Sequence, residues 1–254
     1  MNYELIKDFL LSIQFLTIIN IQNSRGTDYE KRLRGTTIFF PFVGLLIGII
    51  LFLTAKLSSL LLPLSVSDAL VLIVLIIITG GLHIDGFADT IDGFAGGKDK
   101  ENILIIMKDS RIGTFGVTGL IMFLMTKYLA IQSLPVDSKY LILTVMPVFG
   151  RWSVLPMGLL FEYARTGGGT GKAFAGSIKL KEFIIGTILS SVIIVSLLGV
   201  KGFLMIAVIF IATLIIGRYS ENRIGGITGD VFGATIEINE LITIIMALVL
   251  FNGE

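Results

Sequence analysis

The sequence contains no cysteine and only one histidine, and only 15% of its 254 residues are charged. The absence of cysteine excludes a fold held together by disulfide bonds. Soluble domains usually carry about 25% charged residues, so the low charge content argues against a soluble enzyme. The net charge of +1 gives no electrostatic reason to expect nucleic acid as a partner. Residues 1–8 contain Glu4, Lys7 and Asp8 without a strongly basic start, so we predict no cleavable signal peptide.

Hydrophobic residues make up 54% of the chain and are gathered into long uncharged runs. One run, residues 35–55, has 21 residues between Arg34 and Lys56. A helix of about 20 apolar residues matches the hydrocarbon thickness of a bilayer. We therefore predict an all-α fold, a polytopic transmembrane helical bundle of about seven (six to eight) spans that forms a single integral-membrane catalytic domain over residues 1–254. The predicted spans are residues 36–55, 68–82, 112–132, 139–160, 183–200, 202–217 and 234–252.

Two segments are harder to place. Residues 9–21 are short and contain Gln14 and Asn20, so a tilted span and a helix lying in the interface both stay open. Residues 56–67 include Pro63 and Ser65 and are predicted to be a connector.

The lysines and arginines predict the orientation of the chain, because an excess of them marks the cytoplasmic side of a membrane protein. Fourteen of the 20 fall on one side of the predicted spans. Lys56, Lys127, Lys139 and Lys201 fall on the other side. We therefore predict a multi-pass protein of the cell membrane whose loops 22–35, 83–111, 161–182 and 218–233 face the cytoplasm.

Three aspartates in the stretch GGLHIDGFADTIDGFAGG, residues 80–97, suggest a metal site. On a helix, Asp85, Asp89 and Asp92 stand at i, i+4 and i+7 and project from one face. Three like charges repel one another unless a cation lies between them, and such hard oxygen ligands suit Mg²⁺ or Mn²⁺. The alternative is three ordinary solvated carboxylates, which is less consistent with the surrounding glycines. We therefore predict a metal-dependent, phosphate-binding site.

Cationic and hydroxyl side chains near these aspartates are candidates for binding phosphate. Lys108 and Arg111 follow in KDSRIGTFG, residues 108–116. A second cluster, GGITGDVFGATIEINE at 225–240, offers Thr228 and Asp230, and Asp230 either completes a metal shell or caps a helix. Between them, TGGGTGKAF contains Lys172, but Ala173 follows it, so the Walker pattern is not met. A backbone phosphate cradle and a plain mobile loop both stay open there.

His83 and Arg151 are the remaining candidates. A lone histidine is more often a packing or hydrogen-bonding residue than a general base, although His83 lies two residues before Asp85. Arg151 falls inside a predicted span, where a charge is costly and usually faces a polar cavity or a partner. We expect it either to pair with an aspartate of the cluster or to reach toward the interface.

These motifs together closely resemble those of the cobalamin synthase family, the adenosylcobinamide-GDP ribazoletransferases. The resemblance rests on the string that runs from His83 to Gly93, on residues 109–113 (DSRIG) at the expected distance, and on GGITGDVFGA near the C-terminus. It implies a membrane enzyme that joins adenosylcobinamide-GDP to α-ribazole, or its 5′-phosphate, and releases GMP, with Mg²⁺ as cofactor.

The resemblance also implies roles for individual residues. Asp85, Asp89 and Asp92 would bind Mg²⁺, and Asp109 or Asp230 would be a further ligand or the base. Lys108 and Arg111 would bind diphosphate oxygens.

Two other functions stay open. A partial likeness to the CDP-alcohol phosphotransferases, membrane enzymes of phospholipid synthesis, lacks their arginine, because Asp89 and Gly96 stand at the two corresponding positions. A transporter of a cation or a phosphate-bearing solute would place its charges near the middle of the membrane, where only Arg151 is expected. Spans with polar faces often pair with another copy, which leaves a homo-oligomer open.

Overall fold

The computed structural model describes residues 3–21 and 29–251 of the chain. This part is helical throughout, with a single isolated bridge between Tyr163 and Ile227 and no strand, as the sequence predicts. The α-helices are α1 (Tyr3–Leu16), α2 (Tyr29–Thr36), α3 (Phe40–Ser58), α4 (Leu64–Ile78), α5 (Leu82–Gly96), α6 (Lys100–Ile106), α7 (Thr114–Gln132), α8 (Val136–Trp152), α9 (Val154–Leu160), α10 (Leu180–Leu198), α11 (Val200–Ile224) and α12 (Gly229–Leu250). Two short 3-10 helices complete the list, η1 (Thr37–Phe39) and η2 (Thr170–Ala173).

Six helical segments of the described chain are long and apolar enough to cross a membrane. They are Arg32–Ser58, Thr114–Gln132, Val136–Leu160, Leu180–Leu198, Val200–Ile224 and Gly229–Leu250. A seventh span is counted if α4 and α5, which meet at an angle of 90°, are taken as one broken span. The structure is thus the polytopic helical bundle that the hydrophobic runs predict. The 14-residue helix α1 is not among the spans, and at 1.5 Å per residue its length of roughly 21 Å is below the hydrocarbon thickness.

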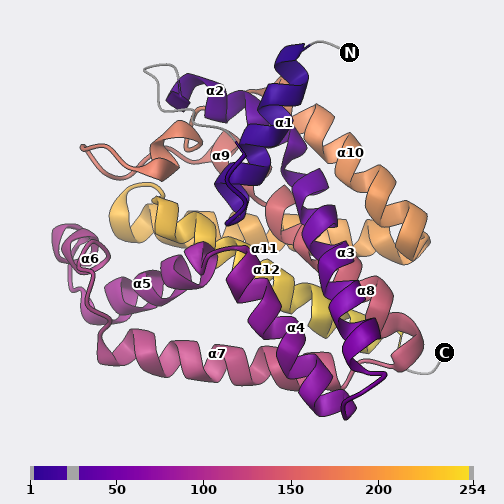
Figure 1. Ribbon diagram of the computed structural model, residues 1–254. Helices are drawn as coiled ribbons and strands as arrows, with labels where there is room; N and C mark the ends of the chain where they lie inside the picture. Colours follow the sequence, from indigo (N-terminus) through magenta and orange to yellow (C-terminus); the bar gives the residue numbers. More distant parts are fainter. Residues whose placement is uncertain (1–2, 22–28, 252–254) are drawn as a thin grey trace.

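Helix α12 lies in the middle of the bundle, where it packs against α5, α7, α8, α9 and α11 (Figure 1). Helices α3 and α8 lie side by side. The outer faces of the spans expose large apolar side chains, such as Met122 on α7, Val192 on α10 and Ile215 on α11. An exposed face of this kind is suited to lipid, so the bundle is apolar outside as well as inside.

The interior of the bundle contains two sets of buried ion pairs. Lys139 of α8 lies 2.8 Å from Asp68 of α4, and both are buried. Lys139, counted on the side opposite the cytoplasm, lies in the first turn of α8, and its charge is neutralised between two helices. A buried charge forms such a pair because leaving it unpaired in an apolar medium is costly.

The second set, which we call the buried charge cluster, consists of Lys127, Arg151, Glu237 and Glu240. The ammonium group of Lys127 lies 2.7 Å from a carboxylate oxygen of both glutamates, and Arg151 pairs with Glu240. Lys127, which falls within the predicted span 112–132, is therefore buried between helices. The expectation that Arg151 pairs with an aspartate or reaches the interface is wrong, because α12 places Glu240 directly beside it. The cluster has two positive and two negative side chains, so its formal charge is zero.

A glycine turn places α5 across the end of α4. Gly80 and Gly81 have φ angles of +62° and +71°, a left-handed conformation that glycine adopts without strain. The turn produces the 90° bend between the two helices. Because of this bend, the aspartate-bearing helix does not continue the direction of α4 but crosses to the N-terminal end of α12 (Figure 1).

Candidate active site

The aspartates of α5 and α12 meet because the two helices touch at a glycine. A methyl group on Gly86 would lie only 2.9 Å from the Cα atom of Asp230. The two backbones therefore approach so closely that only glycine, which has no side chain, fits at position 86. This contact brings Asp85, Asp89 and Asp230 to one place, and the other two carboxylates repel that of Asp89 electrostatically. Asp85 is exposed, whereas Asp89 and Asp230 are half-buried. The predicted association of the two aspartate motifs is thus present in the fold.

Arg165 is the cation that faces this group. Its guanidinium lies 2.8 Å from Asp230 Oδ2, and its Nε is buried without a hydrogen-bond partner in the described part of the chain. The segment that carries it is fixed by two backbone hydrogen bonds, from Ala164 to Ile227 and from Ile227 to Glu162, at 2.9 and 2.8 Å. From the sequence, Arg165 is predicted only to be one of the cations of the cytoplasmic loop 161–182. Its position beside the glycine run was the one signal that could have singled it out.

Thr228 is the N-cap of α12. Its hydroxyl oxygen accepts a hydrogen bond from the backbone N–H of Val231 at 3.3 Å, and the hydroxyl donates to Asp230 Oδ2 at 3.2 Å. A threonine in this position satisfies one of the free N–H groups at the start of the helix. Thr228 therefore positions Asp230, and its predicted contact with substrate stays a prediction.

Asp92 lies on α5 with the other two aspartates but is used differently. It is buried, and its two carboxylate oxygens accept hydrogen bonds from the backbone N–H groups of Gly113 and Gly116, at 2.6 and 2.7 Å. These groups belong to the start of α7, where a negative charge is stabilising. The carboxylate thus anchors α7 to α5. A role for Asp92 in binding metal stays a prediction, and it would compete with these two hydrogen bonds.

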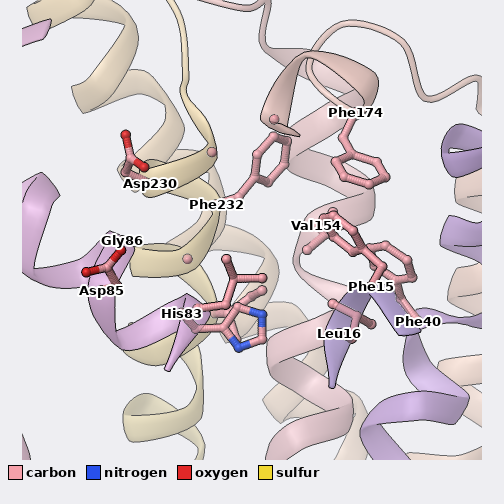
Figure 2. Close-up of a pocket in the computed structure, with 15 residues that line it drawn as sticks. Phe15, Leu16, Phe40, His83, Asp85, Gly86, Val154, Phe174, Asp230 and Phe232 are labelled. Carbon is pink, nitrogen blue, oxygen red and sulfur yellow. The ribbon is translucent and has the colours of Figure 1, made fainter. Parts of the chain in front are cut away.

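A small pocket of about 80 Å³ opens beside the carboxylates. Asp85 and Asp230 line one side, and phenyl rings and aliphatic side chains line the other (Figure 2). His83 lies between the two sides. The aromatic rings come from four separate segments, and sequence reasoning did not single them out. They are Phe15, Phe40, Phe174 and Phe232.

His83 is buried, and its Nδ1 lies 3.3 Å from a terminal nitrogen of Arg151. Arginine can only donate a hydrogen bond, so Nδ1 accepts it and the proton of the neutral ring resides on Nε2. In this tautomer His83 can donate a hydrogen bond from Nε2 but cannot accept a proton there. The predicted catalytic role of His83 stays a prediction, and the geometry favours a donor over a general base. Arg151 itself is fully buried and does not line the pocket.

Several predicted site residues lie outside the pocket. Lys108 is exposed in the loop after α6, and Lys172 is exposed on η2, next to Gly171, which does line the pocket. Arg111 is exposed and forms an ion pair with Asp109 at 2.7 Å. Hydrogen bonds from the guanidinium and the backbone N–H of Arg111 lower the pKa of Asp109 to about 2. A carboxylate with so low a pKa is a weak proton acceptor, so Asp109 suits the predicted role of base poorly.

The donor set is compatible with a hard divalent cation. Asp85, Asp89 and Asp230 lie near one another, and among the described residues Arg165 is the cation that acts on them. In the described part of the chain, no three His, Cys, Asp or Glu side chains lie close enough together to hold a metal ion by themselves. Mg²⁺ rarely needs a complete set of protein ligands, because proteins usually hold it with one or two carboxylates together with phosphates of the substrate.

Comparison with known proteins identifies the family. A family model described as cobalamin-5-phosphate synthase matches residues 8–249. An adenosylcobinamide-GDP ribazoletransferase of Clostridium tetani is 37% identical over 247 residues, which cover 96% of this chain and 97% of the relative. Relatives of the same name from Acetivibrio thermocellus and Clostridium acetobutylicum are 35% and 36% identical, over 95% and 96% of this chain and 97% of each relative. No solved structure matches the chain significantly. The chain therefore belongs to the cobalamin-5-phosphate synthase family, as its motifs suggest.

Proposed function

We propose that this protein is an adenosylcobinamide-GDP ribazoletransferase, which joins adenosylcobinamide-GDP to α-ribazole, or to its 5′-phosphate, and releases GMP. The family and the names of the relatives support this activity. The structural observation that carries the proposal is that Asp85 and Asp230 line one pocket, with Asp89 and Arg165 close to them. Displacement at a diphosphate requires cations that neutralise the phosphate charge and a base that accepts the proton of the attacking hydroxyl. Arg165 and the carboxylates can meet these two requirements.

The chemical step is a displacement at phosphorus. A ribose hydroxyl oxygen of α-ribazole forms a bond to the phosphorus on the cobinamide side of the diphosphate. The bond from this phosphorus to the bridging oxygen breaks, and its electron pair leaves with GMP. The hydroxyl proton passes to a carboxylate, for which we propose Asp230, because it lines the pocket and its Oδ1 makes no hydrogen bond within the described chain.

Arg165 would bind the diphosphate. Its Nε is buried and has no partner in the described residues, so a phosphate oxygen would satisfy it. Its guanidinium also holds Asp230 in place. The N-terminus of α12 lies at the same position, and the free N–H groups there favour a negatively charged group. The exposed Lys108, Arg111 and Lys172 would then attract the anionic substrate from solution, not hold it in the pocket.

We propose that Asp85 and Asp89 bind Mg²⁺ together with the diphosphate. When bound, the ion supplies charge neutralisation for the diphosphate and for the leaving oxygen. The two carboxylates are one helical turn apart on α5, and the repulsion that Asp89 experiences from Asp85 and Asp230 would be relieved by a cation. Asp92 is less suited, because both its oxygens already accept backbone hydrogen bonds.

We further propose that the protein lies in the cell membrane with this pocket toward the cytoplasm. The support is the excess of lysine and arginine in the predicted cytoplasmic loops. Two of the four cations counted for the opposite side, Lys127 and Lys139, are neutralised in buried ion pairs, so neither is a free charge there. Residues 22–28, which include Arg25, lie outside the described chain.

The proposed activity is tested by product analysis. Purified protein in detergent, given Mg²⁺, adenosylcobinamide-GDP and α-ribazole, should form a cobalamin and GMP in equal amounts, identified by mass spectrometry. The same assay with α-ribazole 5′-phosphate shows which acceptor is preferred. If folded protein forms no GMP with either acceptor but releases CMP from a CDP-alcohol, the chain is instead a phospholipid-type phosphotransferase.

A further inference from the structure

The pocket beside the carboxylates has an apolar half that the proposed displacement at phosphorus does not use. Four phenylalanines from different parts of the chain form a connected group there. The ring centroids of Phe15 and Phe174 are 5.1 Å apart, and Phe174 is 5.6 Å from Phe40 and 6.2 Å from Phe232. Such distances are typical of aromatic pairs that pack edge to face or tilted.

This half of the pocket offers stacking surface and little hydrogen bonding. Its other lining residues include Leu16, Val154 and Ile236, and the one polar side chain near it is His83. A ligand that fits it is flat, aromatic and largely without polar groups on its edge. Guanine does not meet this description, since its edge carries several donors and acceptors that would be left unpaired, at a cost, among phenyl rings. A corrin ring is too large for a pocket of about 80 Å³ in which carboxylates occupy one side.

We infer that the four phenylalanines form the binding site for the benzimidazole base of α-ribazole, an inference that rests on the proposed function. The base is a fused pair of rings without exocyclic donors. With the base among the phenyl rings, its ribose lies toward His83 and its hydroxyls toward Asp85 and Asp230, on the opposite side of the same pocket (Figure 2). The proton on Nε2 of His83 can be donated to a ribose oxygen between the two halves. The pocket thus holds α-ribazole in one orientation, with its base at the phenylalanines and its reacting hydroxyl at the carboxylates.

The test uses purified, Mg²⁺-supplemented protein and measures KM separately for α-ribazole and adenosylcobinamide-GDP. Phe232→Leu and Phe15→Leu keep an apolar side chain and remove a stacking surface, and Phe52→Leu is the control, because Phe52 packs on Tyr140 away from the pocket. The expected result is a KM for α-ribazole about ten-fold higher in both pocket variants. Loss of one base-stacking ring typically weakens binding by about this factor or more. The KM for adenosylcobinamide-GDP, and both KM values of the control, should stay within about two-fold of the wild-type values.

A second measurement needs no variant. Wild-type protein is given the α-riboside of imidazole, which has one ring in place of two, and its KM should exceed that of α-ribazole by about ten-fold. Equal KM values for the two ribosides would overturn the inference, as would an unchanged KM for α-ribazole in folded pocket variants. A rise confined to adenosylcobinamide-GDP would also overturn it and assign the rings to guanine. Failure of the proposed function looks different, because wild-type protein would then release no GMP with any riboside.

Discussion

Gly86 of α5 and Asp230 of α12 are in backbone contact, with only 2.9 Å between the Cα atom of Asp230 and the place where a methyl group on Gly86 would lie. This contact joins two aspartate motifs that are far apart in the sequence. It places Asp85 and Asp230, the latter held by Arg165, on the same side of the pocket.

Asp89→Asn should lower the rate of GMP release by at least about a hundred-fold, in the range by which single electrostatic groups in active sites contribute. The substitution preserves the shape of the side chain and removes the charge that we assign to Mg²⁺ binding. Because Asp89 is half-buried and forms no ion pair in the described structure, the thermal midpoint should not fall. Asp137→Asn is the matched control, since Asp137 is exposed at the first turn of α8, and it should keep the wild-type rate. Near-normal turnover by Asp89→Asn would exclude Asp89 from the metal site.

Asp92→Ala should reduce stability even without Mg²⁺. It leaves the N–H groups of Gly113 and Gly116 without an acceptor, and hydrogen bonds to a charged group contribute about 1.5 to 3 kcal/mol each. The measurement is the thermal midpoint in detergent with a chelator present, compared with Asp85→Ala, whose exposed side chain should leave the midpoint unchanged. If Asp92→Ala is as stable as wild type but binds Mg²⁺ more weakly, the carboxylate is a metal ligand and not an anchor of α7.

Lys127→Met should strongly destabilise the protein, because it leaves Glu237 without its cation inside the bundle. Breaking a buried ion pair by removing one partner typically costs about 3 to 5 kcal/mol. Adding Glu237→Gln should recover much of the loss, since Arg151 and Glu240 then remain as a balanced pair. Chemical denaturation of the single and double variants in detergent measures this coupling. Strictly additive losses would mean that the buried charge cluster does not act as a unit.

The orientation of the protein can be tested directly, because the natural chain has no cysteine. A single cysteine at Lys172, exposed on η2, should react with a membrane-impermeant maleimide only after the cells are opened. A single cysteine at Ser133, exposed at the end of α7, should react in intact cells, because it follows a span whose start lies near the aspartates. The reverse labelling pattern would place the pocket outside the cytoplasm.

The sequence predicts the helical spans well, because their signal is local and only the length of an uncharged run matters. It also predicts that the aspartates of α5 lie on one face, since helical periodicity fixes this. Periodicity cannot show that Asp92 faces the start of α7, because that depends on how the loop at 107–113 returns. Likewise, Arg151 clearly needs a partner in the membrane, but its choice of Glu240 follows from which helices are neighbours.

The aromatic half of the pocket could not be predicted. The chain contains 18 phenylalanines, and in an apolar sequence nothing local distinguishes the four that meet in the pocket from those that face lipid or fill the core. Arg165 was missed for a related reason. Its importance comes from a tertiary contact with Asp230, and loop arginines are common in membrane proteins.

The most direct test of the central claim is the dependence of GMP release on Mg²⁺. Protein that has been purified, freed of metal with a chelator and given adenosylcobinamide-GDP and α-ribazole should release no GMP, and added Mg²⁺ should restore GMP and an equal amount of cobalamin. This result is expected because Asp85, Asp89 and Asp230 repel one another around the place where the diphosphate would bind. Full release of GMP in excess chelator would contradict the account and show that the carboxylates act without a metal ion.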